Sequence, residues 1–138
     1  MRFLMTYASA AKAPPTPEHM AAIAKFSEEM TKAGVLLMTG GLQRPTKGTQ
    51  LRMSGGKFTV TDGPFAETKE LIAGYWIINV KSLQEAIDWA RRVPNPHGGN
   101  QEGEIEIRPF FELEDFAPSE AIARHRELGQ ELAKKKGA

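Results

Sequence analysis

Two helix patterns with clear start and stop signals separate the strand-like parts of this chain, and their order constrains the fold more than any other feature. The first follows residues 16–18, where a capping hydroxyl, a proline and an acid favour a helix N-terminus. It ends at Gly34, since glycine readily adopts the left-handed conformation found after helices. The second follows a capping box at Ser82 and Glu85 and ends by about Val93, before two prolines. The chain therefore contains two helices that connect strands.

Strand patterns fill the segments around these helices. Bulky residues alternate over residues 3–7, and the short apolar run over residues 35–39 predicts a strand covered on both faces. Residues 75–80 are rich in aromatic and β-branched side chains, so we expect them at the sheet centre. Ile105 and Ile107 alternate with charged residues and predict a last strand with one solvated face. The order strand-helix-strand-strand-helix-strand closes most simply as an α+β fold, an antiparallel four-stranded sheet with both helices on one face.

Two further segments extend this core. Glycines and a proline over residues 40–48 predict a loop, and residues 51–60 alternate in hydrophobicity around a Gly-Gly pair, which predicts an inserted β-hairpin. Residues 119–136 predict a third, largely surface helix that ends in three lysines. We therefore divide the chain into a domain of residues 1–117 and a helical tail of residues 118–138.

Placing both helices on one face leaves the other face of the sheet bare. We expect that bare face to carry apolar side chains from the neighbourhoods of Phe3, Tyr7, Tyr75, Ile77 and Ile105. A large apolar patch marks a partner, and the simplest partner is a second copy related by a two-fold axis. The sequence therefore predicts a homodimer formed through the sheet face.

Charge and composition exclude several classes of protein. Eighteen basic against seventeen acidic residues leave a net charge of +1, too small for the phosphate-neutralising surface of a nucleic-acid-binding protein. The chain has no cysteine, which excludes thiolate nucleophiles, disulfides and cysteine-ligated metals. No apolar run approaches the roughly 20 residues of a membrane span. The three histidines lack metal-ligand spacing, so we expect no metal site. From these observations together we expect a cytoplasmic protein with no nucleotide cofactor, nucleic-acid partner or membrane partner.

The densest polar cluster lies over residues 61–70, where three acids, a lysine and a rigid turn stand between two strands. One interpretation is catalytic: the turn holds Asp62 at the edge of a cleft, Glu67 as a like charge raises one carboxyl pKa, and Lys69 holds an anionic group. The other interpretation is structural. Asp62 and Glu67 then make buried hydrogen bonds that fix the hairpin to the sheet, and Asp62→Ala costs roughly 1–3 kcal/mol of stability.

Residues 62–70 read DGPFAETKE, which resembles the signature of the YCII-related family and, within it, of the DGPF branch. The sequence GYWII at residues 74–78 and Arg108-Pro109 at the end of the last strand extend the resemblance over about residues 1–111. The resemblance implies a ferredoxin-like fold whose two copies pair sheet to sheet as a dimeric α/β barrel. Most members of the family are of unknown activity. A few relatives look like small-molecule enzymes acting on ring compounds, and genes of the branch accompany alternative sigma factors.

The chain departs from the compact relatives at their acid/base pair. Those relatives carry a histidine on the first helix and an aspartate before the proline that follows the second. Here Val93 precedes that proline, and the middle of the first helix offers Ala24 and Lys25. Any catalysis must therefore be built from the 61–70 cluster and from the histidines.

Three histidines and one tyrosine complete the candidates. His19 lies in the first turn of the first helix, where a neutral hydrogen-bonded ring is favoured, and His125 lies in the charged tail. His97 lies in a loop whose glycines allow the backbone to approach a ligand, and Tyr75 orients a substrate if its face of the strand points into the barrel. The candidate catalytic residues are Asp62, Glu67 and His97, and the candidate substrate-binding residues are Lys69, Tyr75 and His19.

Two classes of function remain open from the sequence. The first is a homodimeric small-molecule-binding protein, as an acid/base enzyme of the lyase or isomerase type, with a pocket between sheet and helices near Asp62 and His97. The second is a non-catalytic interaction or regulatory module, linked to sigma-factor-type transcription regulation, that binds another protein through its helix faces and residues 118–138.

Overall fold

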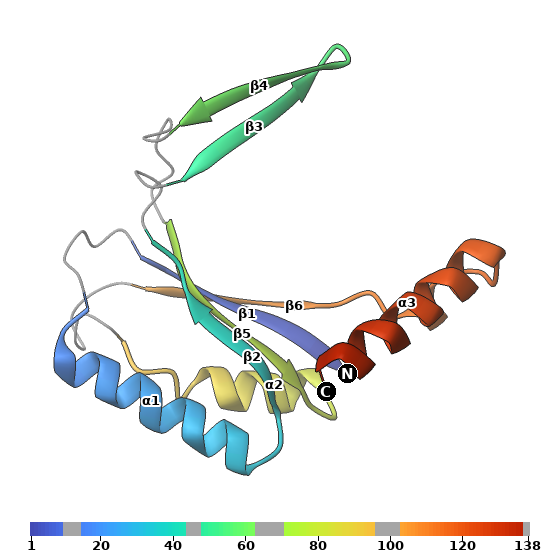
Figure 1. Ribbon diagram of the computed structural model, residues 1–138. Helices are drawn as coiled ribbons and strands as arrows, with labels where there is room; N and C mark the ends of the chain where they lie inside the picture. Colours follow the sequence, from blue (N-terminus) through green and yellow to red (C-terminus); the bar gives the residue numbers. More distant parts are fainter. Residues whose placement is uncertain (10–14, 44–47, 63–70, 96–102, 137–138) are drawn as a thin grey trace.

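A four-stranded antiparallel sheet covered on one face by two helices forms the body of the molecule (Figure 1). The computed structural model describes residues 1–9, 15–43, 48–62, 71–95 and 103–136. The sheet has the strand order β2-β5-β1-β6, and each neighbouring pair is antiparallel. Its strands are β1 (Arg2–Ser9), β2 (Leu36–Gly41), β5 (Leu71–Asn79) and β6 (Glu104–Pro109). The predicted α+β class, the antiparallel sheet and the central position of the 75–80 segment are confirmed.

The two covering helices are α1 (Pro17–Lys32) and α2 (Leu83–Ala90), and both begin at the predicted caps. The Thr16 hydroxyl accepts a hydrogen bond from the His19 N–H at 3.1 Å, and the Ser82 hydroxyl accepts one from the Glu85 N–H at 3.1 Å. The Glu85 carboxylate in turn accepts from the Lys81 N–H, so it reaches one residue beyond the serine. α2 ends at Ala90, three residues before the predicted limit.

The hydrophobic core lies between the sheet and these helices. Every second residue of β1 points into it, because successive side chains of a strand alternate between faces. Phe26 of α1 makes an edge-on contact with Trp76 of β5 at 5.7 Å between ring centroids. The buried hydrophobic residues, all 7% exposed or less, are Phe3, Met5, Tyr7, Phe26, Met30, Val35, Trp76, Ile78, Val80 and Ala86.

β2 differs from its prediction as a strand covered on both faces. It is an edge strand that pairs only with β5 in the described sheet, and Leu37 and Met38 are about half exposed. A register shift between Leu36 and Met38 interrupts its pairing. The apolar run 35–39 misled the prediction because a short run looks the same whether its second face is covered or bare. Gly40 and Gly41, expected in a loop, are the last residues of β2.

The inserted hairpin is present and forms a sheet of its own. Its strands are β3 (Thr49–Ser54) and β4 (Lys57–Asp62), joined by Gly55 and Gly56 with φ angles of 58° and 77°. Only glycine adopts such angles without a steric cost, so the Gly-Gly pair sets the tight turn. In Figure 1 the hairpin stands away from the main sheet, on the side opposite α1 and α2.

The C-terminal segment forms a short 3-10 helix, η2 (Leu113–Asp115), and a long helix, α3 (Glu120–Lys136). The Ser119 hydroxyl accepts from the Ile122 N–H at 3.1 Å and caps α3. Among the described residues of α3 only Ile122 is partly buried, and a side chain added at Gly129 would meet no atom within 4 Å. The predicted surface helix is confirmed. None of the described helices is both long and apolar enough to span a membrane.

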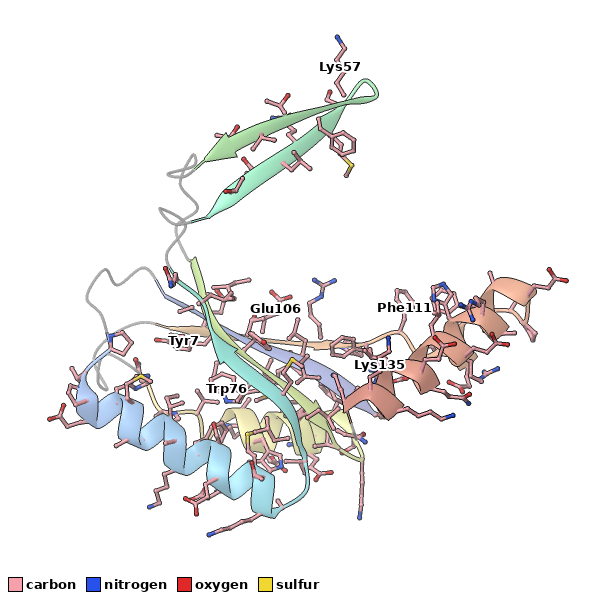
Figure 2. The ribbon with its side chains drawn as sticks, viewed as in Figure 1. Tyr7, Lys57, Trp76, Glu106, Phe111 and Lys135 are labelled. Carbon is pink, nitrogen blue, oxygen red and sulfur yellow. The ribbon has the colours of Figure 1, made fainter. Side chains whose placement is uncertain are left out.

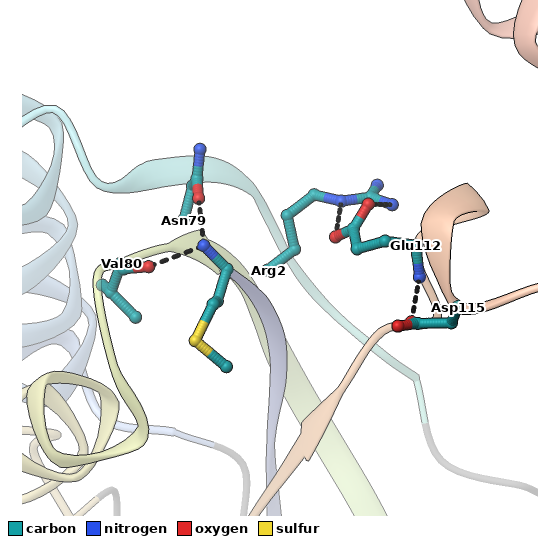
Figure 3. Close-up of polar contacts among 6 residues, drawn as sticks. Arg2, Asn79, Val80, Glu112 and Asp115 are labelled. Atoms are coloured by element: carbon teal, nitrogen blue, oxygen red, sulfur yellow. Dashed lines mark hydrogen bonds and ion pairs between the residues drawn. The ribbon is translucent and has the colours of Figure 1, made fainter.

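A group of polar contacts ties the start of β1 to its neighbours (Figure 3). The Met1 amine donates to the Val80 carbonyl at 2.8 Å. The Arg2 guanidinium donates two hydrogen bonds to the Glu112 carboxylate, each at 3.0 Å. These bonds lower the pKa of Glu112 below its ordinary value, and they hold the segment after β6 against β1.

Candidate functional site

The face of the sheet that α1 and α2 do not cover is the candidate site, and we call it the open face. The strand registers place its side chains in three rows that cross the sheet. The first row contains Met38, Ile77, Leu4 and Arg108. The second row contains Gly40, Tyr75, Thr6 and Glu106, and the third contains Ile72, Ala8 and Glu104. The open face thus changes from mainly apolar at the first row to mixed and acidic at the third.

This arrangement corrects the predicted composition of the bare face. Tyr75 and Ile77 lie on it, as expected. Phe3, Tyr7 and Ile105 point to the opposite side and belong to the core or pack against it. Figure 2 shows the same division, with Glu106 on the open side and Tyr7 and Trp76 on the side of the helices. The sequence pattern gives the alternation of a strand but not which of its two faces the helices cover.

A hollow of about 200 Å³ lies on the open face, across the second and third rows. It is lined by Thr6, Ala8, Ile72, Glu104 and Glu106. The two glutamates are two residues apart on β6 and therefore project from the same side of the strand. Arg108 contacts Glu106 at 3.6 Å, so the acidic lining is partly neutralised. The hollow offers hydrogen-bond acceptors on one wall and aliphatic carbon on the other.

Tyr75 lies beside this hollow in the second row. Its ring packs over Gly40 of β2, where an added Cβ would lie 3.1 Å from the phenol oxygen. The Thr39 hydroxyl donates to the Tyr75 carbonyl at 2.9 Å and joins the two strands at the same point. Gly40 therefore provides the space in which the phenol ring lies, a role that its interpretation as a loop residue missed.

The predicted site residues fall into three groups. Tyr75 lies on the open face. His19 lies in the first turn of α1, on the other side of the sheet, so the structure does not bring these two together. Asp62 is the last residue of β4 and pairs with Thr49, but its side chain lies outside the described residues. Glu67, Lys69 and His97 also lie outside the described residues.

The described hollow is not where the sequence placed a pocket. The sequence places a pocket between sheet and helices near Asp62 and His97, whose side chains lie outside the described residues, and the described side chains between the sheet and the two helices form the buried core. Trp76 is part of this core, and its indole N–H finds no hydrogen-bond acceptor within the described part of the chain. Thr6, Glu104 and Glu106 were missed as site residues. The signal for both acids was present in the alternation with Ile105 and Ile107, which indicated only a solvated face.

Within the described ranges, no three His, Asp or Glu side chains lie close enough to hold a metal ion. The arrangement described here is therefore one of hydrogen-bond acceptors, a phenol and aliphatic side chains.

Comparison with known proteins extends these observations. Uncharacterized protein R00369 of Rhizobium meliloti (strain 1021) is 38% identical over 88 residues, which are 64% of this chain and 69% of that relative. The family model described as the YCII-related domain matches residues 1–114, from the start of β1 to η2. The four-stranded sheet, both covering helices and the inserted hairpin thus fall within the match, and the chain belongs to the YCII-related domain family.

Proposed function

We propose that this chain is a homodimeric small-molecule-binding protein whose ligand lies on the open face of the sheet. In this proposal the fold is ferredoxin-like, the chain belongs to the DGPF branch, and two copies pair through their open faces as a dimeric α/β barrel. The observation that carries the proposal is an uncovered sheet face on which an apolar row adjoins a hollow lined by two carboxylates.

The first row supplies the dimer contact. Leu4 and Ile77 are directly paired across β1 and β5, and Met38 extends the row to β2. A second copy seated on this row removes apolar surface from water, which stabilises association. The hollow then lies in the enclosed space between two sheets.

The lining of the hollow indicates the class of ligand. Glu104, Glu106 and the hydroxyl of Thr6 accept hydrogen bonds, and Ile72 and Ala8 contact carbon. A small ring compound that carries hydroxyl or amino groups satisfies both walls. Enclosure by the partner lowers the local dielectric and strengthens those hydrogen bonds.

Acid/base catalysis is part of the proposal through the 61–70 cluster. Asp62, Glu67 and His97 are proposed as catalytic, and Lys69, Tyr75 and His19 as substrate-binding. The position of the 61–70 cluster in the sequence supports its part in the proposal. Lys69 lies three residues before Ile72 of the hollow, and Asp62 is the last residue of β4, the strand that precedes β5. His19 and His97 rest on the sequence pattern alone.

Ligand-observed NMR with phenol, catechol and benzylamine as probes tests the site. We expect saturation transfer to at least one probe with the unchanged protein, and a loss of about tenfold in affinity with Glu106→Gln, which replaces a charged acceptor oxygen with an NH2 donor, or with Tyr75→Phe, which removes the phenol hydroxyl. Glu28→Gln on the outer face of α1 is the matched control and should bind as the unchanged protein does. Equal affinity in Glu106→Gln, or a monomer by light scattering, contradicts the proposal.

Asp62→Ala separates the catalytic from the structural interpretation of the turn. Loss of probe binding or turnover in a variant that remains a dimer supports the catalytic role. A lower melting temperature with full probe affinity supports the role of fixing the hairpin to the sheet.

The alternative function, a non-catalytic interaction or regulatory module linked to sigma-factor-type transcription regulation, is favoured by one observation. α3 carries exposed Leu128 and Leu132 and packs little on the body of the protein. Truncation after residue 117 tests it: the alternative predicts that a protein partner is lost while probe binding is kept.

A further inference from the structure

The β3–β4 hairpin presents an apolar surface that nothing in the described chain covers. Leu51 pairs with Val60 and Met53 pairs with Phe58, so all four side chains lie on one face of the hairpin. Each of them is between 54% and 74% exposed. We call these four residues the hairpin patch.

The other face of the hairpin is polar, so the hairpin is amphipathic. Gln50 pairs with Thr61 and Arg52 with Thr59 on that face. A two-stranded hairpin is marginally stable by itself in water and gains stability when one face packs on something else. The hairpin patch is therefore built to be covered, whereas the polar face is built to remain in water.

A second set of exposed apolar side chains lies in the C-terminal segment, and we call it the C-terminal patch. It consists of Phe111, Phe116, Leu128 and Leu132, which are 43–75% exposed. The rings of Phe111 and Phe116 lie 5.1 Å apart. An ion pair between Arg126 and Glu114, at 3.9 Å, joins α3 to η2.

The two patches belong to opposite ends of the sheet. The hairpin is inserted between the end of β2 and the start of β5, where Gly41 pairs with Gly74. The C-terminal segment follows the end of β6, where Pro109 pairs with Phe3 near the start of β1. Figure 1 shows the hairpin rising from one end of the sheet and α3 beyond the other.

We propose that, in the homodimer, the hairpin patch of each copy packs on the C-terminal patch of its partner. The inference rests on the proposed function, since it requires pairing through the open face. In such a dimer a two-fold axis lies in the plane between the two sheets and runs perpendicular to the strands. Rotation about this axis exchanges the two ends of the sheet. It therefore brings the hairpin of one copy to the C-terminal patch of the other, and the contact occurs twice and closes the dimer.

The size of the open face supports this arrangement. Its three rows contribute about a dozen side chains, and several are charged, whereas a stable interface takes roughly 20–30 residues a side and a largely apolar centre. The two patches supply the missing apolar contacts. They also bury the eight exposed side chains of the two patches in one event.

Chemical cross-linking tests the contact directly, because the chain has no cysteine of its own. Four double variants combine Met53→Cys or Phe58→Cys with Leu128→Cys or Leu132→Cys, and each is treated with a short bismaleimide. We expect at least one of them to give a covalent dimer, with each single-cysteine variant as control. Equal dimer yield from a single hairpin variant indicates that hairpins meet each other and overturns the proposal, as does a cross-link within one chain.

The result is distinguishable from failure of the proposed function. A protein that is dimeric by light scattering but gives no inter-subunit cross-link in any double variant overturns this contact alone. A monomeric protein overturns the homodimer and this contact together.

A second measurement does not depend on cross-linking geometry. Phe58→Ser combined with Val60→Ser removes half of the hairpin patch, and we expect it to weaken the dimer by about tenfold or more. Thr59→Ala combined with Thr61→Ala changes the polar face of the same strand and should leave the dimer dissociation constant unchanged. Equal dissociation constants for the two pairs overturn the proposal.

Discussion

The two faces of the four-stranded sheet differ in how far their side chains are exposed. Along β1, Phe3 and Met5 are at most 2% exposed, whereas Leu4 and Thr6, which alternate with them, remain partly exposed. The backbone is shared, so the difference comes only from what covers each face. The buried contacts of the covered face stabilise the monomer. The open face is therefore free to carry polar groups, a hollow and a contact with another molecule.

Neighbouring isoleucines of β5 give the largest expected difference between the faces. Ile78 is fully buried under the helices, and Ile78→Ala should cost about 2–5 kcal/mol through lost burial and the cavity left behind. Ile77 lies on the open face, so Ile77→Ala should cost about 1 kcal/mol or less in the monomer and instead weaken the dimer. Urea unfolding at low protein concentration measures both values. Equal costs at the two positions contradict the division of the faces.

Substitutions at Gly103 and Gly40 test how much space is available beside the side chains on each face of the sheet. A Cβ at Gly103 would lie 2.7 Å from the hydroxyl of buried Tyr7, so Gly103→Ala should cost about 1–3 kcal/mol by overpacking. A Cβ at Gly40 would meet the ring of Tyr75, which is only half buried and has room to move. Gly40→Ala should therefore leave the melting temperature nearly unchanged and reduce probe affinity. A large drop in melting temperature for Gly40→Ala shows that Tyr75 is held as rigidly as Tyr7.

Helix caps extend the comparison to covering and non-covering helices. Ser82 caps α2, which covers the sheet, and Ser82→Ala should lower the free energy of unfolding by about 1 kcal/mol. Ser119 makes the same kind of bond at the start of α3, but α3 hardly packs on the body. Ser119→Ala should thus increase hydrogen exchange within α3 without changing global unfolding. The reverse pattern shows that α3 belongs to the cooperative unit.

The smallest expected effect is a pH dependence from Arg2 and Glu112. The hydrogen bonds from Arg2 depress the pKa of Glu112 in the folded state, so their stabilisation is present above the ordinary pKa of 4.5 and is lost as the pH falls through the folded value. Both side chains are about two-fifths exposed, which limits the contribution to about 0.2–1 kcal/mol. The difference in melting temperature between the unchanged protein and Glu112→Gln should shrink between pH 6 and pH 3. A constant difference contradicts this assignment.

Much of the fold was predictable because its signals are local. The caps at Thr16 and Ser82, the turn at Gly55-Gly56 and the alternation along β1 each follow from a few neighbouring residues. The predictions that were wrong depended on contacts between residues far apart in the sequence. The edge position of β2 depends on strand order, and the covered side of β1 depends on where the helices pack.

The candidate site was less predictable for the same reason. Thr6, Ile72 and Glu106 come from three strands and meet only through the register of the sheet. The sequence pattern pointed instead to the 61–70 cluster, where acidic and basic residues lie close together in the sequence. Tyr75 is the residue common to both lines of reasoning, because it was singled out by sequence and lies beside the hollow in the structure.

The borders of the sheet have a consequence for how molecules of this protein accumulate. β6 forms one border and carries Glu104, Glu106 and Arg108, and β2 forms the other and is interrupted by the shift between Leu36 and Met38. Charged side chains and irregular pairing make poor templates for docking another strand. Sideways extension into fibrils is therefore discouraged at both borders, and a crowded solution of this protein should yield discrete particles rather than threads.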